Sequence, residues 1–185
     1  GLCRSCSGPL EVEYQGQIAE YDTRILTLSL LKGFFSITSG EPVSYVNAPQ
    51  VADEHGLEVR PTSTTTARDY VNLITVRLGE HSVAGTLQGL HAVPTLVMIE
   101  DHTIDVPPAE HLLVVRNSDT PGMIGKVGTT VGAAGVNIDD MAVGSSSPDG
   151  SKALMVLATN EAVPDEVVQQ LRATDGVVSV ASVSS

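Results

Sequence analysis

The chain has 185 residues, of which 42% are hydrophobic, and carries a formal net charge of −12 with a pI of about 4.6. This acidity argues against nucleic acid or anionic membrane surfaces as partners, because either would need a basic patch. The sequence has neither an apolar run of about eighteen residues nor a signal-like start, so we expect a cytoplasmic globular protein of two modest domains.

The chain begins with a predicted strand at 10–14 and a predicted helix at 22–35. Apolar residues recur at helical spacing in the second segment, and Asp22 is the expected cap at its start. A helix of this kind has one apolar face. We therefore expect it to pack on a sheet.

A second helix is predicted to start at Asn47 and Pro49, and Gly56 should end it before a strand at 57–62. Segments that alternate or run apolar between turn residues then predict successive antiparallel strands at 70–76, 83–87, 94–100 and 103–106. The first half is therefore expected to be an α/β-type domain with a mostly antiparallel sheet.

Pro107 and Pro108 mark the expected boundary between two domains. Neither proline can donate a hydrogen bond to a strand neighbour, and each favours an extended conformation in the residue before it. We place one domain at 1–108 and the other at 109–185.

The most informative segment begins with a strand at His111 and continues through a turn into an amphipathic helix. Asp119 and Thr120 are the predicted caps of this helix, Pro121 is its predicted first residue, and Gly135 is the expected left-handed residue at its end. The apolar face of the helix is formed by Ile124, Val127, Val131 and Ala134.

The rest of the second half completes a regular order of elements. Strands are predicted at 138–144, 153–159 and 177–183, with a turn at 145–150 and a helix at 164–172. The order is βαββαβ, the ferredoxin-like arrangement in which two helices cover one face of an antiparallel sheet. The fold class of the whole chain is therefore predicted to be α+β.

The turn before the central helix has the chemistry of a receptor for a small amino acid. A helix start offers unpaired N–H groups and partial positive charge, and Gly122 leaves this backbone open to a carboxylate. Asp119 supplies an anion for an ammonium group, and Asn137 carries both a donor and an acceptor. The alternative is that Asp119 is a plain cap and Asn137 a plain turn residue.

With this element order and turn chemistry, the segment from about 110 to 185 resembles an ACT domain, the ligand-binding module of many enzymes of amino-acid metabolism. The most specific match pairs Asp119–Gly122 with Gly135–Ile138. Asn117 departs from the His or Tyr that often stands there in serine-responsive members. The resemblance implies an effector site, commonly formed across an interface between two modules, at Asn117, Asp119, Thr120, Pro121, Gly122, Asn137 and Ile138.

The first half resembles the intervening domain of the longer class of D-3-phosphoglycerate dehydrogenases, through VEYQGQIAEYDTR, LTLSLLKGFF, VSYVNAPQVADEHGLEV and SVAGTLQG. The resemblance implies a regulatory region that binds L-serine as feedback effector and forms a homo-oligomer, a dimer or a tetramer. Related domains occur in some bacterial L-serine dehydratases, and a stand-alone amino-acid-sensing or dimerisation module is a further alternative.

No catalytic residue, cofactor or metal is expected within this stretch. It has no G-x-G-x-x-G loop that opens a helix after a strand, so NAD is expected in an upstream domain, and the start without Met reads as a cut through a longer polypeptide. Cys3 and Cys6 lack the further ligands that zinc would need. A phosphate site in the first domain would need basic residues to converge from elsewhere in the fold, namely Lys32, Arg60, Arg68 and Arg77.

Overall fold

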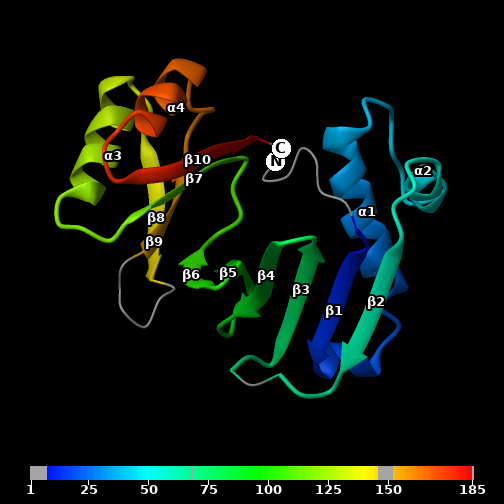
Figure 1. Ribbon diagram of the computed structural model, residues 1–185. Helices are drawn as coiled ribbons and strands as arrows, with labels where there is room; N and C mark the ends of the chain where they lie inside the picture. Colours follow the sequence, from blue (N-terminus) through cyan, green and yellow to red (C-terminus); the bar gives the residue numbers. More distant parts are fainter. Residues whose placement is uncertain (1–7, 68, 146–151, 185) are drawn as a thin grey trace. The chain divides into compact units, whose positions relative to one another are not determined.

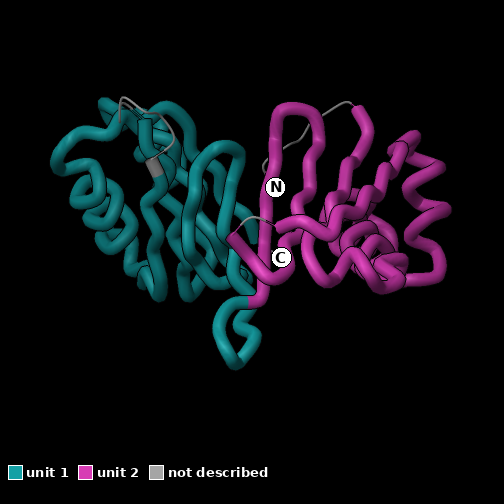
Figure 2. Tube along the Cα trace, turned by 90° about the horizontal axis from the view of Figure 1, so that it is seen from below, with its two compact units in different colours: residues 1–4, 88–185 teal, residues 5–87 magenta. Residues whose placement is uncertain are grey.

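The computed structural model describes residues 8–67, 69–145 and 152–184. Contacts divide the described residues into two compact units, one within residues 5–87 and one within residues 88–185 (Figure 2). We call them the amino-terminal and the carboxyl-terminal unit and describe each by itself. Both contain helices and sheets, so the α+β class is confirmed.

The amino-terminal unit places two helices on one face of its strands (Figure 1). Its strand order is β2-β1-β3-β4, with β1 and β2 parallel and the other neighbours antiparallel. The parallel pair arises because two helices carry the chain back across the sheet between β1 and β2. The elements are β1 Leu10–Gly16, η1 Gln17–Glu20, α1 Arg24–Thr38, α2 Ala48–Glu54, β2 Val59–Thr64, β3 Asn72–Leu78 and β4 His81–Gln88.

Strand alternation explains the core of this unit. Leu10, Val12 and Tyr14 point to the helical side of β1 and pack against Leu31 and Phe35 of α1. The residues between them are glutamates on the opposite face. Burial of these alternate side chains holds the helices on the sheet.

The predicted cap Asp22 and the predicted helix-start residue Asn47 both behave differently from expectation. The residue that precedes α1 is Thr23, and no side chain caps the helix; Asp22 instead accepts a hydrogen bond from the Arg24 N–H at 3.1 Å. Asn47 precedes α2, but its side-chain oxygen turns away and accepts the Ser44 N–H at 2.6 Å. The predicted end at Gly56 is confirmed by a left-handed φ of 65°.

In the carboxyl-terminal unit, an antiparallel sheet of order β10-β7-β9-β8 carries α3 and α4 on one face, which confirms the predicted βαββαβ order (Figure 1). Its core includes Leu113, Val127, Leu157 and Leu171. A hairpin, β5–β6, precedes this fold. The elements are β5 Val93–Ile99, β6 His102–Val106, β7 His111–Ser118, α3 Met123–Ala133, β8 Ile138–Ser145, β9 Lys152–Thr159, α4 Asp165–Arg172 and β10 Val177–Ser184.

The predicted start of α3 is wrong by two residues. The helix begins at Met123, not at Pro121, and no Asp119 or Thr120 side chain caps it. Gly122 precedes the helix in the left-handed region, with φ 92°, and this conformation interrupts helical geometry at the point where Pro121 would have opened it. Gly135 follows the carboxyl end of α3 in the left-handed region, with φ 82°, as predicted. The predicted turn at 145–150 lies almost wholly outside the described residues.

The hairpin β5–β6 covers the sheet face that the helices leave free. Met155 and Leu157 of β9 belong to the helical core, whereas Leu154 and Val156, which point the other way, are equally buried, and β6 contacts both β8 and β9. Contacts therefore group the hairpin with the carboxyl-terminal unit. The predicted domains divide at 108, and that boundary stays a prediction.

Candidate functional site

A hollow of about 280 Å³ lies between the turn after β7, the start of α3 and the helical face of the sheet. It is lined by Asn117, Asp119, Thr120, Pro121, Gly122, Met123, Ile124, Val143, Ala153 and Met155. Five of the seven predicted site residues line it. The structure thus brings the β7–α3 turn together with residues of β8 and β9.

Asn117 forms part of the floor of this hollow. It follows Leu113 and Val115 on the helical face of β7 and pairs with Ala153 across the ladder. The side chain is 2% exposed; its Nδ2 donates to the Ser118 carbonyl at 2.7 Å, while its Oδ1 has no hydrogen-bond partner among the described residues. A buried acceptor without a partner costs about 1–3 kcal/mol. This oxygen is therefore suited to receive a donor from a ligand.

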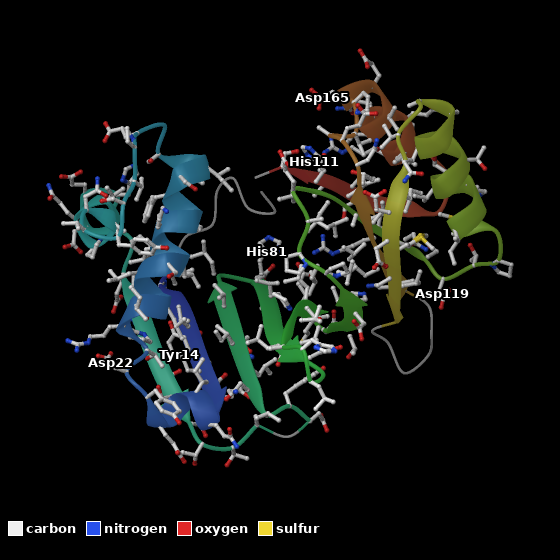
Figure 3. All side chains as sticks on the ribbon, turned by 180° about the vertical axis from the view of Figure 1, so that it is seen from behind. Tyr14, Asp22, His81, His111, Asp119 and Asp165 are labelled. Atoms are coloured by element: carbon white, nitrogen blue, oxygen red, sulfur yellow. The ribbon has the colours of Figure 1, made fainter. Side chains whose placement is uncertain are left out.

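The rim of the hollow offers charge of both signs. Asp119 is an exposed carboxylate beside the start of α3 (Figure 3). The Thr120 N–H donates to the Ser118 carbonyl and the Met123 N–H to the Thr120 carbonyl. No side chain caps the helix, so the following N–H groups of its first turn keep the partial positive charge of a helix start. A carboxylate, a buried acceptor and a helix start in one hollow match the two ends of a zwitterion.

Asn137 and Ile138, the other two predicted site residues, lie outside this hollow. The Asn137 N–H donates to Asn160 Oδ1 at 2.9 Å, and its Nδ2 donates to Asp139 Oδ1 at 2.6 Å. Ile138 is partly buried and packs against the helical core. Asn137 was expected to act across an interface between modules, and this role stays a prediction.

Sequence reasoning missed the apolar lining of the hollow. Met123 and Ile124 open α3, while Val143, Ala153 and Met155 come from β8 and β9. The turn motif carries no information on these strands, but strand alternation and ladder register would have placed Val143 opposite Met155 on the helical face. Ile124 and Val143 stay 49% and 44% exposed, so the hollow has an apolar rim.

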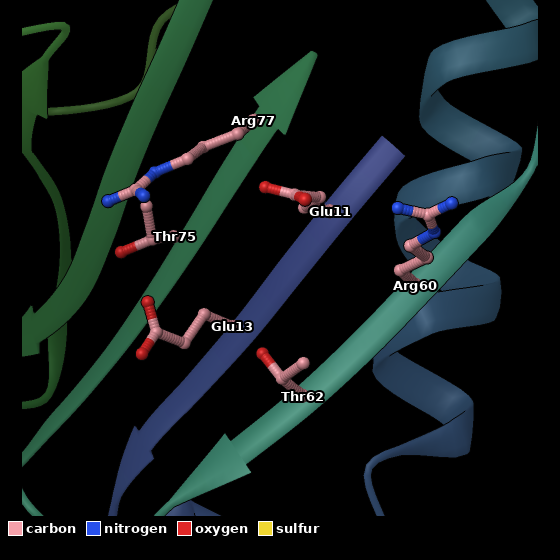
Figure 4. A pocket seen from close by; sticks show the side chains of 6 residues that line it. All are labelled: Glu11, Glu13, Arg60, Thr62, Thr75 and Arg77. Carbon is pink, nitrogen blue, oxygen red and sulfur yellow. The ribbon is translucent and has the colours of Figure 1, made fainter. Parts of the chain in front are cut away.

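A second hollow, of about 180 Å³, lies on the open face of the amino-terminal sheet (Figure 4). Cross-strand register places Glu11 between Arg60 and Arg77, and Glu13 between Thr62 and Thr75. Of the four basic residues that a phosphate site would need to bring together, Arg60 and Arg77 line this hollow. Lys32 lies over the Tyr45 ring instead, and Arg68 lies outside the described residues.

The charges in this second hollow balance. The Arg60 guanidinium already donates to both Glu58 oxygens at 2.8 Å, which lowers the pKa of that carboxyl and raises the pKa of Arg60. Glu11 and Glu13 offset the charges of the two arginines. The hollow thus lacks the surplus of positive charge that a phosphate group needs.

The largest of these three hollows, about 550 Å³, lies between α1, α2 and β2. Leu28, Leu31, Ala52 and Leu57 give it apolar walls. Asn117 Oδ1, the buried acceptor without a hydrogen-bond partner among the described residues, belongs to a residue that lines neither this hollow nor the second one. The hollow at α3 is therefore the best-built candidate.

The described residues offer neither a metal-binding cluster nor a helix that could span a membrane. Within 8–67, 69–145 and 152–184, no three His, Cys, Asp or Glu side chains are placed to hold a metal ion; Cys3 and Cys6 fall outside these ranges. In the same part of the chain, the helices are too short or too polar to span a membrane.

Comparison with known proteins matches both halves of the chain. Residues 6–100 match the D-3-phosphoglycerate dehydrogenase intervening domain, and residues 111–176 match the ACT domain. A D-3-phosphoglycerate dehydrogenase of Mycobacterium leprae is 34% identical over 163 residues, 85% of this chain and 31% of that protein. Proteins of the same name from Synechocystis sp. and Bacillus subtilis are 33% and 31% identical, over 91% of this chain in each case and 31% and 33% of their own lengths.

The chain thus spans about a third of the length of these curated relatives. The first match alone covers residues 6–100, more than half of the chain, and the second begins a few residues after the hairpin β5–β6. The chain belongs to the D-3-phosphoglycerate dehydrogenase intervening-domain family, with an ACT domain following the intervening domain.

Proposed function

We propose that this chain is the regulatory region of an NAD-dependent D-3-phosphoglycerate dehydrogenase and that its ACT domain binds L-serine as feedback effector in the hollow at the start of α3. The observation that carries the proposal is that Asn117 lines this hollow and that its buried Oδ1 has no hydrogen-bond partner among the described residues. The names of the relatives favour the dehydrogenase over an L-serine dehydratase.

The chemistry of the hollow fits a small amino acid. Asn117 Oδ1 and the Asp119 carboxylate would accept hydrogen bonds from the ligand ammonium group. The first-turn N–H groups of α3 would receive the ligand carboxylate, and Gly122 keeps the approach to them clear of a side chain. Val143 and Met155 leave room for a short side chain beside them.

A second copy of the chain would complete the site. Ile124, Met141 and Val143 are 49%, 38% and 44% exposed; Met141 and Val143 pair with core residues of β9, so both face the helical side of edge strand β8. A facing module would bury this apolar rim and supply Asn137. We propose a homo-oligomer, a dimer or a tetramer, in which serine stabilises one arrangement of the modules through its higher affinity for that arrangement.

We propose no catalytic step for this chain itself. The relatives are about three times as long, and hydride transfer with NAD is assigned to the part of such a protein that this chain does not include. The chain contributes the effector site and, through it, the level of activity. A coupling of about 1–3 kcal/mol between effector and activity state would be typical.

Isothermal titration of the chain with L-serine tests the proposal, with glycine, L-alanine and D-serine as competitors and the mass in solution measured alongside. Saturable, stereoselective binding by an oligomer is expected. Absence of binding by a folded oligomer would contradict serine as effector.

Two substitutions test the residues themselves. Asp119→Ala should abolish serine binding and keep the fold, whereas Asp53→Ala, which removes an exposed carboxylate on α2, should leave the affinity unchanged. Asn117→Leu should abolish binding with little change in thermal stability, because it removes a buried acceptor that has no partner, and the Ser118 carbonyl that loses the Asn117 Nδ2 donor keeps the Thr120 N–H. Unchanged serine affinity in either site variant would remove that residue from the site.

A further inference from the structure

The hairpin β5–β6 is tied to the strand that carries Asn117. Arg116 and Asn117 are consecutive on β7, so their side chains point to opposite faces of the sheet. Asn117 lines the hollow, whereas the Arg116 guanidinium donates to Glu100 Oε1 in the hairpin turn and to Ser179 Oγ of β10 at 3.3 Å. The Arg116 and Glu100 side chains are 25% and 22% exposed, so this ion pair is largely shielded from solvent.

The turn that supplies Glu100 has an uncommon backbone conformation. Glu100 has φ 55°, in the left-handed region that few non-glycine residues adopt. It stands between β5 and β6, where the chain reverses direction. A non-glycine residue keeps such a conformation only where its surroundings hold it, and the ion pair with Arg116 is one such restraint.

Strand β8 also has one residue in the hollow and the next residue against the hairpin. Val143 lines the hollow, and its neighbour Gly144 faces the hairpin. A Cβ added at Gly144 would overlap the carbonyl oxygen of Thr103 in β6, so only glycine permits the two backbones to lie this close. Residues 116 and 117 on β7, and residues 144 and 143 on β8, thus each link the hairpin to the hollow through adjacent positions.

We infer that the hairpin β5–β6 is the rear support of the effector site, and that effector binding and hairpin docking are coupled through Arg116 and Glu100 as positioning residues. The inference rests on the proposed function of the hollow. The intervening-domain match runs to residue 100, so β5 carries intervening-domain sequence into the carboxyl-terminal unit. Effector occupancy then reaches the intervening domain through this hairpin, and coupling of this kind acts equally in both directions.

The test combines titration with hydrogen exchange on the whole chain. L-serine should bind Arg116→Met about tenfold more weakly than the parent chain, within the range usual for coupled sites. Arg60→Met, which breaks an exposed ion pair in the other unit, should leave the affinity unchanged. In the parent chain, serine should slow amide exchange across residues 93–106, and in Arg116→Met this protection should be lost.

Two more variants separate positioning from plain stability. Glu100→Gln keeps the shape of the side chain and removes its charge, so it should weaken binding in the same direction with a smaller change in fold stability. The charge swap Glu100→Arg with Arg116→Glu should recover much of the affinity lost by either change alone. A merely structural role would lower thermal stability and leave the serine-dependent protection of the hairpin intact.

The outcomes distinguish the two proposals. If the parent chain binds no serine, the proposed function and this inference both fail. If the parent chain binds serine, and Arg116→Met and Glu100→Gln bind it equally well with the same hairpin protection, the inference alone is overturned.

Discussion

Two helices of this chain are preceded by the same dipeptide and begin in opposite ways. Asp22-Thr23 comes before α1, and Asp119-Thr120 comes before α3. At α1, Arg24 closes on the Asp22 carboxylate with a shortest N–O distance of 2.5 Å, and the same carboxylate accepts the Arg24 N–H. At α3, Pro121 and Gly122 follow and the chain turns through left-handed geometry, so that Asp119 does not reach the first helical residue as Asp22 does, although neither helix has a side-chain cap at the residue that precedes it.

The difference shows that the residues after a capping pair decide whether a helix start is filled or open. Arg24 is the first residue of α1, and its guanidinium donates a hydrogen bond to the Asp22 carboxylate. Pro121 cannot donate a backbone hydrogen bond, and Gly122 displaces the helix by two residues, so Asp119 is left on the rim of a hollow. One start is closed by the protein, and the other is available to a ligand.

The largest effect on this comparison is expected from Gly122→Ala. Its φ of 92° disfavours any side chain, while a Cβ there would meet nothing within 4 Å, so the cost comes from the backbone alone. We expect a loss of about 1–2 kcal/mol in the free energy of unfolding, measured by urea denaturation. Gly125→Ala is the matched control, because Gly125 lies inside α3 with equal space and should gain up to about 1 kcal/mol. Changes of the same sign in both variants would contradict the open left-handed start.

A smaller effect is expected where α1 is fastened to its sheet. The Thr27 side chain, in the first turn of α1, lies 2.8 Å from the Tyr14 hydroxyl, and burial raises the pKa of Tyr14. Tyr14→Phe should lower the free energy of unfolding by about 1 kcal/mol. Tyr21→Phe, at an exposed position, should change it little. Equal effects of the two substitutions would mean that the buried hydroxyl does not anchor the helix start.

The smallest effect concerns the carboxylate at α1. Hydrogen bonds from Arg24 lower the pKa of Asp22 from its ordinary 3.8 to about 2. Its contribution to stability is therefore present above pH 3.8 and is lost as the pH falls through about 2. In Arg24→Gln, NMR titration of the Asp22 carboxyl should move its midpoint back toward 3.8. A midpoint that stays low would show that Arg24 does not hold the carboxylate.

Periodicity was enough to predict most of the fold. The strand at 153–159 and the glycine ends at Gly56 and Gly135 follow from local patterns that the tertiary structure supports. Of the predicted apolar face of α3, Val127 and Val131 are buried, whereas Ile124 and Ala134 are exposed, because the helix turns Met123 to the core instead. The parallel β1–β2 pair and the hairpin on the rear face of the ACT sheet depend on contacts between distant segments. Local patterns do not encode such contacts.

The sequence predicts the turn residues of the candidate site but not the strand residues that form its floor. The sequence from Asp119 to Gly122 favours a helix start nearby, and the structure places it at the hollow. Val143 and Met155 reach the hollow only because β8 and β9 pair in one register. The start of α3 was misplaced because proline is common at the first helical position, whereas here a left-handed glycine follows it.

The close approach of β6 to Gly144 bears on how this pair of domains could be exchanged between proteins. A recombination break between residues 100 and 111, where the two family matches leave a gap, would separate the ACT strands from β5 and from part or all of β6. The transplanted module would then show Leu154 and Val156 to water, an apolar surface suited to unwanted association. A break before residue 88 would carry the whole hairpin along, so the unit that can be inherited intact is longer than the ACT sequence itself.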